Sequence, residues 1–122
     1  MDVAKNKRAS FTKYWLPVII YAIFIFSISS VPGQDIPSLF AYQDVLAHII
    51  EYAILGLLIA RALKASSPHM GLRKRLVWTV LLALGYALTD EFHQSFVPAR
   101  FPSWCDVGYD TIGVLAAGIL YR

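Results

Sequence analysis

The stretch QDVLAHIIEYAILGLLIARAL, residues 43–63, decides the fold because a helix of this sequence is apolar on nearly every face. A helix on the surface of a soluble protein would instead carry polar residues along one side. At about 1.5 Å per residue, the segment is long enough to cross a hydrocarbon core of roughly 30 Å. We therefore predict a transmembrane helix over about residues 44–63.

Three more segments have the same apolar character, and they predict spans at about residues 14–30, 76–95 and 105–121. The third span reaches membrane length only if its helix continues through DEFHQ, residues 90–94. The whole chain agrees with this interpretation, since 57% of its 122 residues are apolar and only 16% are charged. Its mean hydropathy of +0.55 lies outside the range of ordinary soluble domains. We expect an all-α fold, an integral membrane bundle of four transmembrane helices in one domain, residues 1–122.

The first segment leaves an alternative open. A basic start, an apolar run and the small residues around Ser27 and Ser29 also fit a signal peptide with its cleavage site. The single Cys105 allows no disulfide within the chain and has no partner at metal-binding spacing.

The charged residues sort by side on this four-span map. Of the 11 Lys and Arg residues, all except Arg100 fall before the first span, between the second and third spans, or at Arg122. Of the 8 Asp and Glu residues, all except Asp2 fall in the opposite half. Because basic residues collect in cytoplasmic segments, both termini are predicted to be cytoplasmic. The net charge of +3 then follows from topology and needs no nucleic-acid partner.

Two of the predicted spans carry a stripe of ionisable residues. Asp44, His48 and Glu51 fall within about 60° of one another on a helix, and Asp106 and Asp110 form a similar stripe. A charge inside an apolar span costs about 2.5–3.5 kcal/mol even on a lenient scale, so these side chains should face the bundle interior. The lower part of the second stripe, Gly113 and Ala117, is small and suits close helix packing.

The segment DEFHQSFVPAR, residues 90–100, adds polar groups at the same end. If the third helix continues, Asp90 and Gln94 share a face with Glu91 beside them, and Arg100 follows in a loop. We expect both stripes and this loop to form one polar pocket near the outer interface, because lipid would otherwise meet unpaired carboxylates.

Several of these residues also have structural interpretations. Asp44 could be the N-cap of its helix, and Ser103 with Asp106 has the spacing of a capping box. Arg100 could form an ion pair with Asp106 or Glu91. His93 fits an interfacial histidine with no chemical role.

The spacing of these motifs resembles the VanZ-like family of small bacterial membrane proteins. The residues that carry the resemblance are Asp44, His48 and Tyr52, then Asp90, Glu91, Gln94, Pro98 and Arg100, then Asp106 and Gly113. Val45 stands where the family usually has lysine, and Asp110 stands where it usually has asparagine. The first departure removes a cation from the site, and the second adds a carboxyl group.

The resemblance implies a function at the membrane surface. The family is named for a protein associated with resistance to teicoplanin, and it is remotely similar to four-helix proteins thought to exchange or hydrolyse phosphate-linked lipid head groups. We expect the chain to bind or process such head groups, from a phospholipid or a polyprenyl phosphate. A non-enzymatic envelope or glycopeptide-resistance factor is the alternative. An ion or proton pathway is disfavoured because the polar stripe ends near Glu51.

Chemical roles follow from this expectation. Catalysis is assigned to His48, oriented by Asp44 or Glu51, with Glu91 and Asp90. Arg100, Gln94 and Tyr52 are assigned to substrate binding, because a guanidinium binds phosphate oxygens bidentately. A divalent cation (Mg²⁺, Mn²⁺ or Ca²⁺) would offset so many acids, and its assigned ligands are Asp44, Asp106, Asp110 and Glu51. The expected partner is membrane lipid, and a homo-oligomer is compatible with the sequence.

Overall fold

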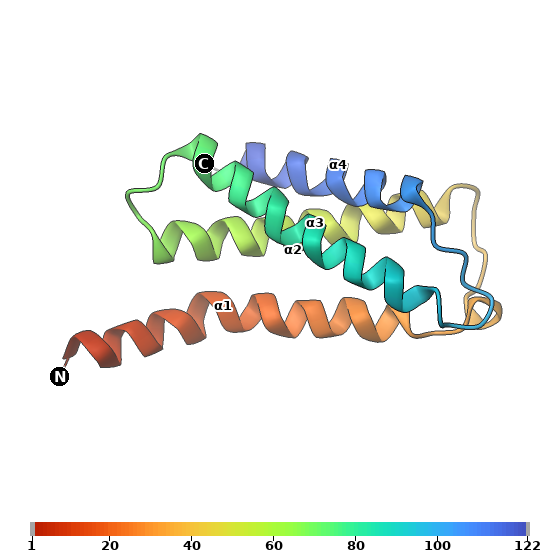
Figure 1. Cartoon of the computed structure of the whole chain (residues 1–122), viewed down its shortest axis with the longest axis horizontal. Coiled ribbons are helices and arrows are strands. Elements are labelled where there is room, and N and C mark those ends of the chain that lie inside the picture. Colours follow the sequence, from red (N-terminus) through yellow and green to blue (C-terminus); the bar gives the residue numbers. More distant parts are fainter. Residues whose placement is uncertain (1, 122) are drawn as a thin grey trace.

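The computed structural model describes residues 2–121, which form four α-helices connected by short loops (Figure 1). The helices are α1 (Asp2–Ser29), α2 (Gln43–Ser66), α3 (Leu72–Gln94) and α4 (Trp104–Leu120), and a 3₁₀ turn, Gly33–Asp35, lies between α1 and α2. Within this range no residue is in a β-strand. The all-α class predicted from the sequence is confirmed. Arg122 lies outside the described residues.

The helix boundaries agree with the sequence-based prediction at residues 90–94 and differ from it at the N-terminus. The helix α3 continues through DEFHQ to Gln94, as its length as a membrane span required. By contrast, α1 begins at Asp2 and not near residue 14, so it has 28 residues and is about 42 Å long. Its basic first half is rich in Ala, Lys and Arg, which are good helix formers without any burial.

Two of the helices are long and apolar enough to cross a membrane by themselves. These are α1 and α2, with mean hydropathies of 1.7 and 1.8 over their most apolar windows. The other two depart from that simple pattern, because α3 begins with Arg73, Lys74 and Arg75 and ends in acidic residues, and α4 has only 17 residues.

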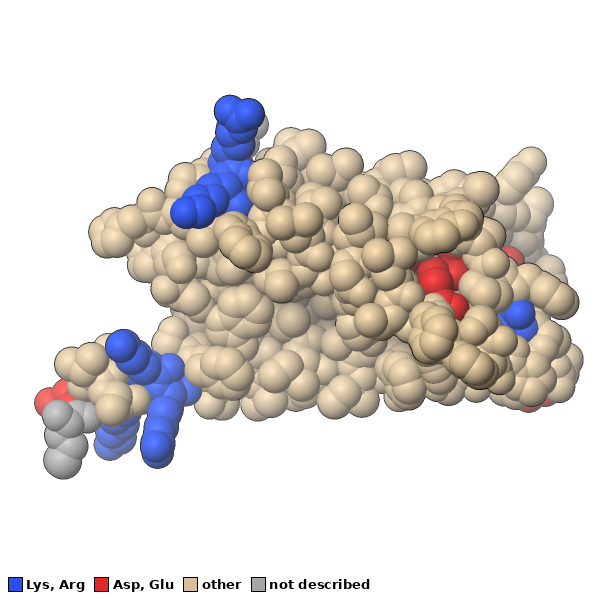
Figure 2. Space-filling view, viewed as in Figure 1, with Lys and Arg blue, Asp and Glu red and all other residues tan. Residues whose placement is uncertain are grey.

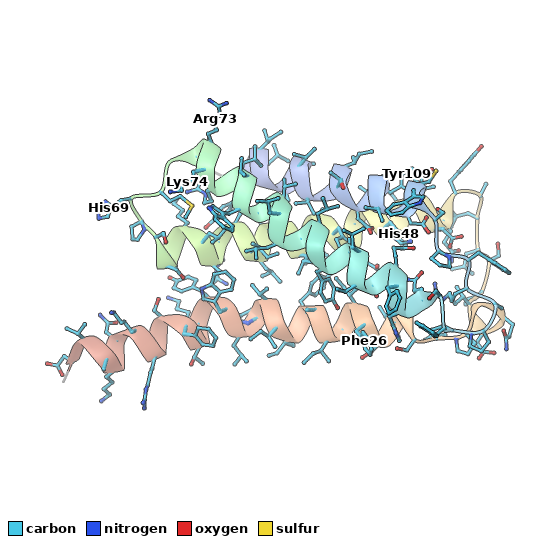
Figure 3. The ribbon with its side chains drawn as sticks, in the orientation of Figure 1. Phe26, His48, His69, Arg73, Lys74 and Tyr109 are labelled. Atoms are coloured by element: carbon cyan, nitrogen blue, oxygen red, sulfur yellow. The ribbon has the colours of Figure 1, made fainter. Side chains whose placement is uncertain are left out.

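Opposite charges lie at opposite ends of the bundle (Figure 2). One end, which we call the basic end, holds the start of α1 and the connection between α2 and α3; His69, Arg73 and Lys74 lie there (Figure 3). The other, the acidic end, holds the α1–α2 and α3–α4 connections and includes His48. Because the chain crosses the bundle four times, acidic segments that are distant in the sequence meet at one end.

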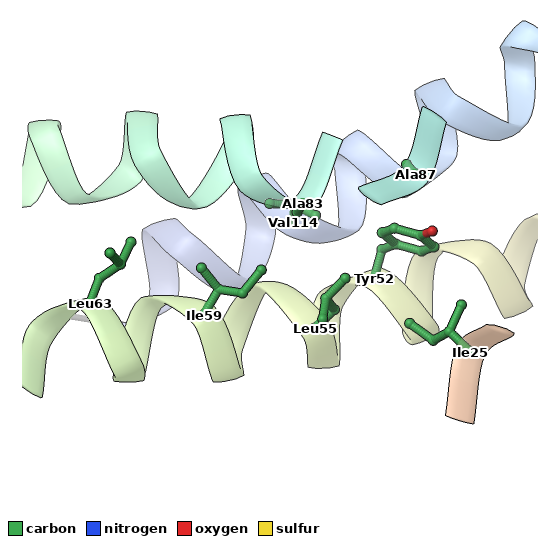
Figure 4. Packing of buried hydrophobic residues seen from close by; sticks show 8 residues of the cluster. All are labelled: Ile25, Tyr52, Leu55, Ile59, Leu63, Ala83, Ala87 and Val114. Atoms are coloured by element: carbon green, nitrogen blue, oxygen red, sulfur yellow. The ribbon is translucent and has the colours of Figure 1, made fainter. Parts of the chain in front are cut away.

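The core is built around α2, which packs most extensively on α4 and also contacts α1 and α3. Its inward side chains meet small residues of α3 and Val114 of α4 (Figure 4). The buried cluster consists of Ile25, Tyr52, Leu55, Ile59, Leu63, Ala83, Ala87 and Val114. Large side chains on α2 against alanines on α3 allow the helices to interdigitate.

The backbones of α2 and α4 are in close contact. A Cβ atom added at Gly113 would lie 2.2 Å from the carbonyl oxygen of Ile49 and 2.9 Å from the amide nitrogen of Ala53. One at Gly56 would lie 3.0 Å from the Cα atom of Val114. The small stretch of α4 is thus the packing surface that the sequence predicted, and it sets the distance between the two polar stripes.

We expect Gly113→Ala to separate α2 from α4, because the added methyl group would collide with backbone atoms that cannot rotate away. The loss of stability should be about 1–3 kcal/mol, the usual cost of overpacking. Thermal unfolding of the detergent-solubilised protein would show it as a lower Tm. The matched control is Gly108→Ala, five residues earlier on α4, where an added Cβ meets nothing within 4 Å. Equal Tm values for the two variants would contradict the role given to Gly113.

Candidate functional site

The polar groups at the acidic end surround a cavity of about 570 Å³, which we call the main cavity. Its walls come from the α1–α2 connection, the first turns of α2, the α3–α4 connection and the start of α4. Asp44, His48, Gln94, Arg100 and Asp106 are the predicted site residues that line it. The acidic end thus contains a polar cavity, and its lining comes from two stretches of the chain, residues 33–48 and 94–106.

The centre of the site is a hydrogen bond between α2 and α4. Nδ1 of His48 lies 2.7 Å from Oδ1 of Asp110, and Nε2 lies 3.9 Å from Oδ1 of Asp106. The imidazole ring is largely buried but borders the main cavity, with Phe26 and Tyr109 at the same end of the bundle (Figure 3). The acid that orients His48 is Asp110, and neither Asp44 nor Glu51 forms a hydrogen bond with it within residues 2–121. A histidine at the wall of a cavity, with one ring nitrogen held by a carboxylate, has the arrangement of a general base.

A third ionisable group joins this pair from α3. One ligand atom each from His48, Glu91 and Asp110 lie within 4.8 Å of one another. Glu91 and Asp110 are buried, 9% and 1% exposed. In the described part of the chain, both carboxylate oxygens of Glu91 and Oδ2 of Asp110 have no hydrogen-bond partner. Buried carboxylates without donors are costly, so the cluster is ready to accept a cation or a hydrogen-bond donor.

A second cavity of about 300 Å³, the side cavity, lies against α1. Glu51 and the buried Asp90 line it, and Ser29 of α1 closes it on the other side. Asp44, His48, Gln94 and Arg100 line both cavities, so the two spaces meet at these residues. The predicted site residues are thus brought together, but Glu51 and Asp90 lie in a different chamber from Asp106.

Arg100 connects the α3–α4 connection to the end of α1. Its Nε and Nη2 atoms donate hydrogen bonds of 2.9 Å to the carbonyl oxygens of Val31 and Ile28. Among the described residues it forms no ion pair with Asp106 or Glu91, so that structural interpretation is wrong. The reason is that the carbonyl groups at and just beyond the C-terminal end of α1 carry partial negative charge and attract the guanidinium, although that of Ile28 also accepts from the Val31 amide. Sequence spacing gave no indication of this contact.

The two connections also touch through their backbones. The amide of Gly33 donates to the carbonyl oxygen of Pro98 over 2.9 Å, and a Cβ atom at Gly33 would lie 1.8 Å from the carbonyl oxygen of Ala99. Ala99 itself has a positive φ of 57°. Only glycine allows the connections to approach this closely, so Gly33 is a site-building residue that the sequence reasoning missed.

The two capping expectations have opposite outcomes. The Ser103 side chain accepts a hydrogen bond of 3.3 Å from the Asp106 amide at the start of α4, as predicted. The N-cap of α2 is Tyr42, in a left-handed conformation, so the assignment of Asp44 as the cap is wrong. The side chain of Gln43 orders this turn instead. Its amide nitrogen donates a hydrogen bond to the Pro37 carbonyl oxygen, and its amide oxygen accepts one from the Leu39 backbone amide. Asp44 does not cap the helix; it is exposed and lines the main cavity.

Two aromatic residues of the motif region lie in packing positions. Tyr52 is fully buried in the helix core next to the Tyr86 ring, and it lines neither cavity. His93 stacks on Phe26 with ring centroids 4.0 Å apart, and its Nε2 lies 3.0 Å from the Ser30 hydroxyl. His93 therefore helps to hold α1 against α3.

Comparison with known proteins agrees with this architecture. No curated protein and no solved structure matches the chain significantly. The family model described as VanZ/LLP1 matches residues 5–122, which include α1 from Lys5 onward, the other three helices and every residue of the site. The two apolar helices agree with a membrane protein, and the match shows that the chain belongs to the VanZ/LLP1 family.

Proposed function

We propose that the protein binds the phosphate-linked head groups of membrane lipids, phospholipids or polyprenyl phosphates, and transfers or hydrolyses them. The observation that carries the proposal is the His48–Asp110 hydrogen bond of 2.7 Å at the wall of a polar cavity. Glu91 lies beside this pair, and Gln94 and Arg100 line the cavity together with His48. This set combines a base with groups that bind a phosphate diester.

The reaction needs only a phosphodiester and a hydroxyl compound, either water or an alcohol. Nε2 of His48 takes the proton from the hydroxyl group, and the oxygen forms a bond to phosphorus. The bond between phosphorus and the leaving head-group oxygen breaks, and that oxygen receives the proton back from His48. Asp110 holds the ring in position and stabilises its charged form during the transfer.

Arg100 and Gln94 are the proposed phosphate ligands. Arg100 uses two of its five N–H groups on α1 carbonyls, so three remain for phosphate oxygens. Its anchoring on α1 also lowers the entropy lost when it binds. One guanidinium against this many carboxylates repels an anion, and we therefore propose a divalent cation (Mg²⁺, Mn²⁺ or Ca²⁺) at Glu91 and Asp110, with Asp106 adjacent.

We also propose that all four helices lie in the bacterial inner membrane, with both termini in the cytoplasm and the site at the outer surface. The separation of basic and acidic ends supports this orientation. The apolar cluster below the site, with Leu55, Ala83 and Val114, supports a closed bundle over an ion or proton pathway.

The proposed orientation predicts opposite labelling of two engineered cysteines. In a Cys105→Ser background, Ser38→Cys places a thiol in the exposed α1–α2 connection, and His69→Cys places one in the exposed α2–α3 connection. A membrane-impermeant maleimide added to intact spheroplasts should label only Ser38→Cys. Both should react after permeabilisation. Labelling of His69→Cys in intact cells would reverse or refute the orientation.

The proposed chemistry predicts that His48→Ala reduces head-group turnover by about 10²–10⁴-fold, because a positioned general base contributes that much. Turnover is measured by mass spectrometry in proteoliposomes of phosphatidylethanolamine and phosphatidylglycerol, with a polyprenyl phosphate added. His69→Ala is the matched control, since His69 is exposed at the basic end.

The outcome also separates the proposal from the non-enzymatic alternative. A wild-type protein that binds lipid head groups without changing them would favour an envelope or glycopeptide-resistance factor. Full activity of His48→Ala, with its fold shown intact by thermal unfolding, would remove the proposed mechanism.

The cation proposal predicts that the purified protein binds Mn²⁺ and that Glu91→Gln with Asp110→Asn weakens the binding by about tenfold or more. Isothermal titration calorimetry in detergent measures the affinity directly, without dependence on activity. Asp2→Asn, an exposed acid at the other end of the bundle, should bind as the wild type does. Equal affinity in all three proteins would exclude a cation at Glu91 and Asp110.

A further inference from the structure

The site has a second opening, toward the side of the bundle. A groove of about 330 Å³ lies between the end of α3 and the start of α4. Its rim is apolar and highly exposed, with Phe92 70% and Trp104 83% exposed. Leu88 and Val107 form its walls, and Val107 is 9% exposed. Such a groove on the flank of a membrane bundle is open to the acyl chains around it.

The groove and the main cavity border different members of one cluster, since His48 lines the main cavity and Glu91 lines the groove. Glu91 lines the groove and is also a member of the cluster with His48 and Asp110. Ser103 lines both the groove and the main cavity. The cluster is therefore approached by two routes of different character: a polar one from the acidic end and an apolar one from the side.

From this pair of routes we infer that the groove binds one acyl or prenyl chain of a lipid whose head group occupies the main cavity. Only an amphiphile matches both openings, because its chain covers Leu88, Phe92, Trp104 and Val107 while its polar part reaches the buried carboxylates. The groove volume is at the low end of the roughly 300–1,000 Å³ of ligand pockets, which suits one chain and not a whole lipid. The identity of the head group rests on the proposed function, but the chain site does not.

The test fills the groove with a larger side chain on the lipid-facing surface. Leu88→Trp narrows the groove, and Leu82→Trp places the same bulk on α3 at an exposed position outside it. The probe is phosphatidylglycerol with a diazirine in one acyl chain, reconstituted with each protein and photolysed. Crosslinks are mapped by mass spectrometry. In the wild type we expect Phe92 and Val107 to be labelled more strongly than Ile23, an exposed residue of α1.

Leu88→Trp should reduce labelling at Phe92 and Val107 by at least about tenfold, the change expected from the loss of two buried methylene contacts. Leu82→Trp should leave it unchanged. Groove labelling no stronger than at Ile23, or labelling that survives Leu88→Trp, would overturn the inference. The wild-type labelling pattern decides the question even if Leu88→Trp lowers stability.

A parallel arm distinguishes failure of the groove from failure of the proposed function. A short-chain, water-soluble phosphodiester should be turned over equally by the wild type and Leu88→Trp, since it uses only the main cavity. Strong groove labelling with no turnover of any substrate would refute the chemistry and keep the chain site. Turnover of long-chain lipid that Leu88→Trp does not affect would keep the chemistry and refute the chain site.

Discussion

The backbone contact between α2 and α4 at Gly113 is the constraint on which the rest of the structure depends. It brings two helices that each carry ionisable residues to the distance at which His48 and Asp110 share a hydrogen bond. The Cβ atom of a larger residue at position 113 would overlap the backbone atoms of Ile49 and Ala53, so the two helices would have to move apart. The same contact closes the core below the site, where Leu55 meets Val114. The same small residues of α4 therefore determine both the packing of the two helices and the geometry of the site.

Charge placement inside an apolar bundle needs compensation, and the structure provides it in two ways. Asp110 is paired with His48, and Arg100 is held by carbonyl groups at the end of α1. Glu91 and part of Asp110 remain without donors, although a buried, unpaired carboxylate is expensive. Such a cost is typical of functional sites, and these carboxylates lie at the acidic end of the bundle and not in the apolar helix core. The polar main cavity borders His48 of this cluster, and the apolar groove borders Glu91.

Much of this arrangement could be predicted from the sequence. Apolar composition and helical periodicity predicted the all-α class, the continuation of α3 through DEFHQ and the meeting of two polar stripes. The Ser103 cap follows from local spacing and was predictable for the same reason. The start of α1 was not predicted from the apolar pattern, because its basic first half forms a helix through the helix propensity of its residues alone. Asp44 was misassigned as a cap because the turn before α2 is ordered by Gln43 and Tyr42.

The sequence by itself determined the helices, their apolar faces, the end of the bundle at which the acids gather and the membership in the VanZ/LLP1 family. These properties depend on residue type and on the spacing of residues within one segment, and both can be read directly from the sequence. Only the tertiary structure decided that Asp110 is the partner of His48, that Arg100 binds the end of α1, and that Glu91 lies beside this pair and also lines an apolar groove. Each of these depends on distances between segments far apart in the chain, and only the packing of the helices and their connections sets those distances.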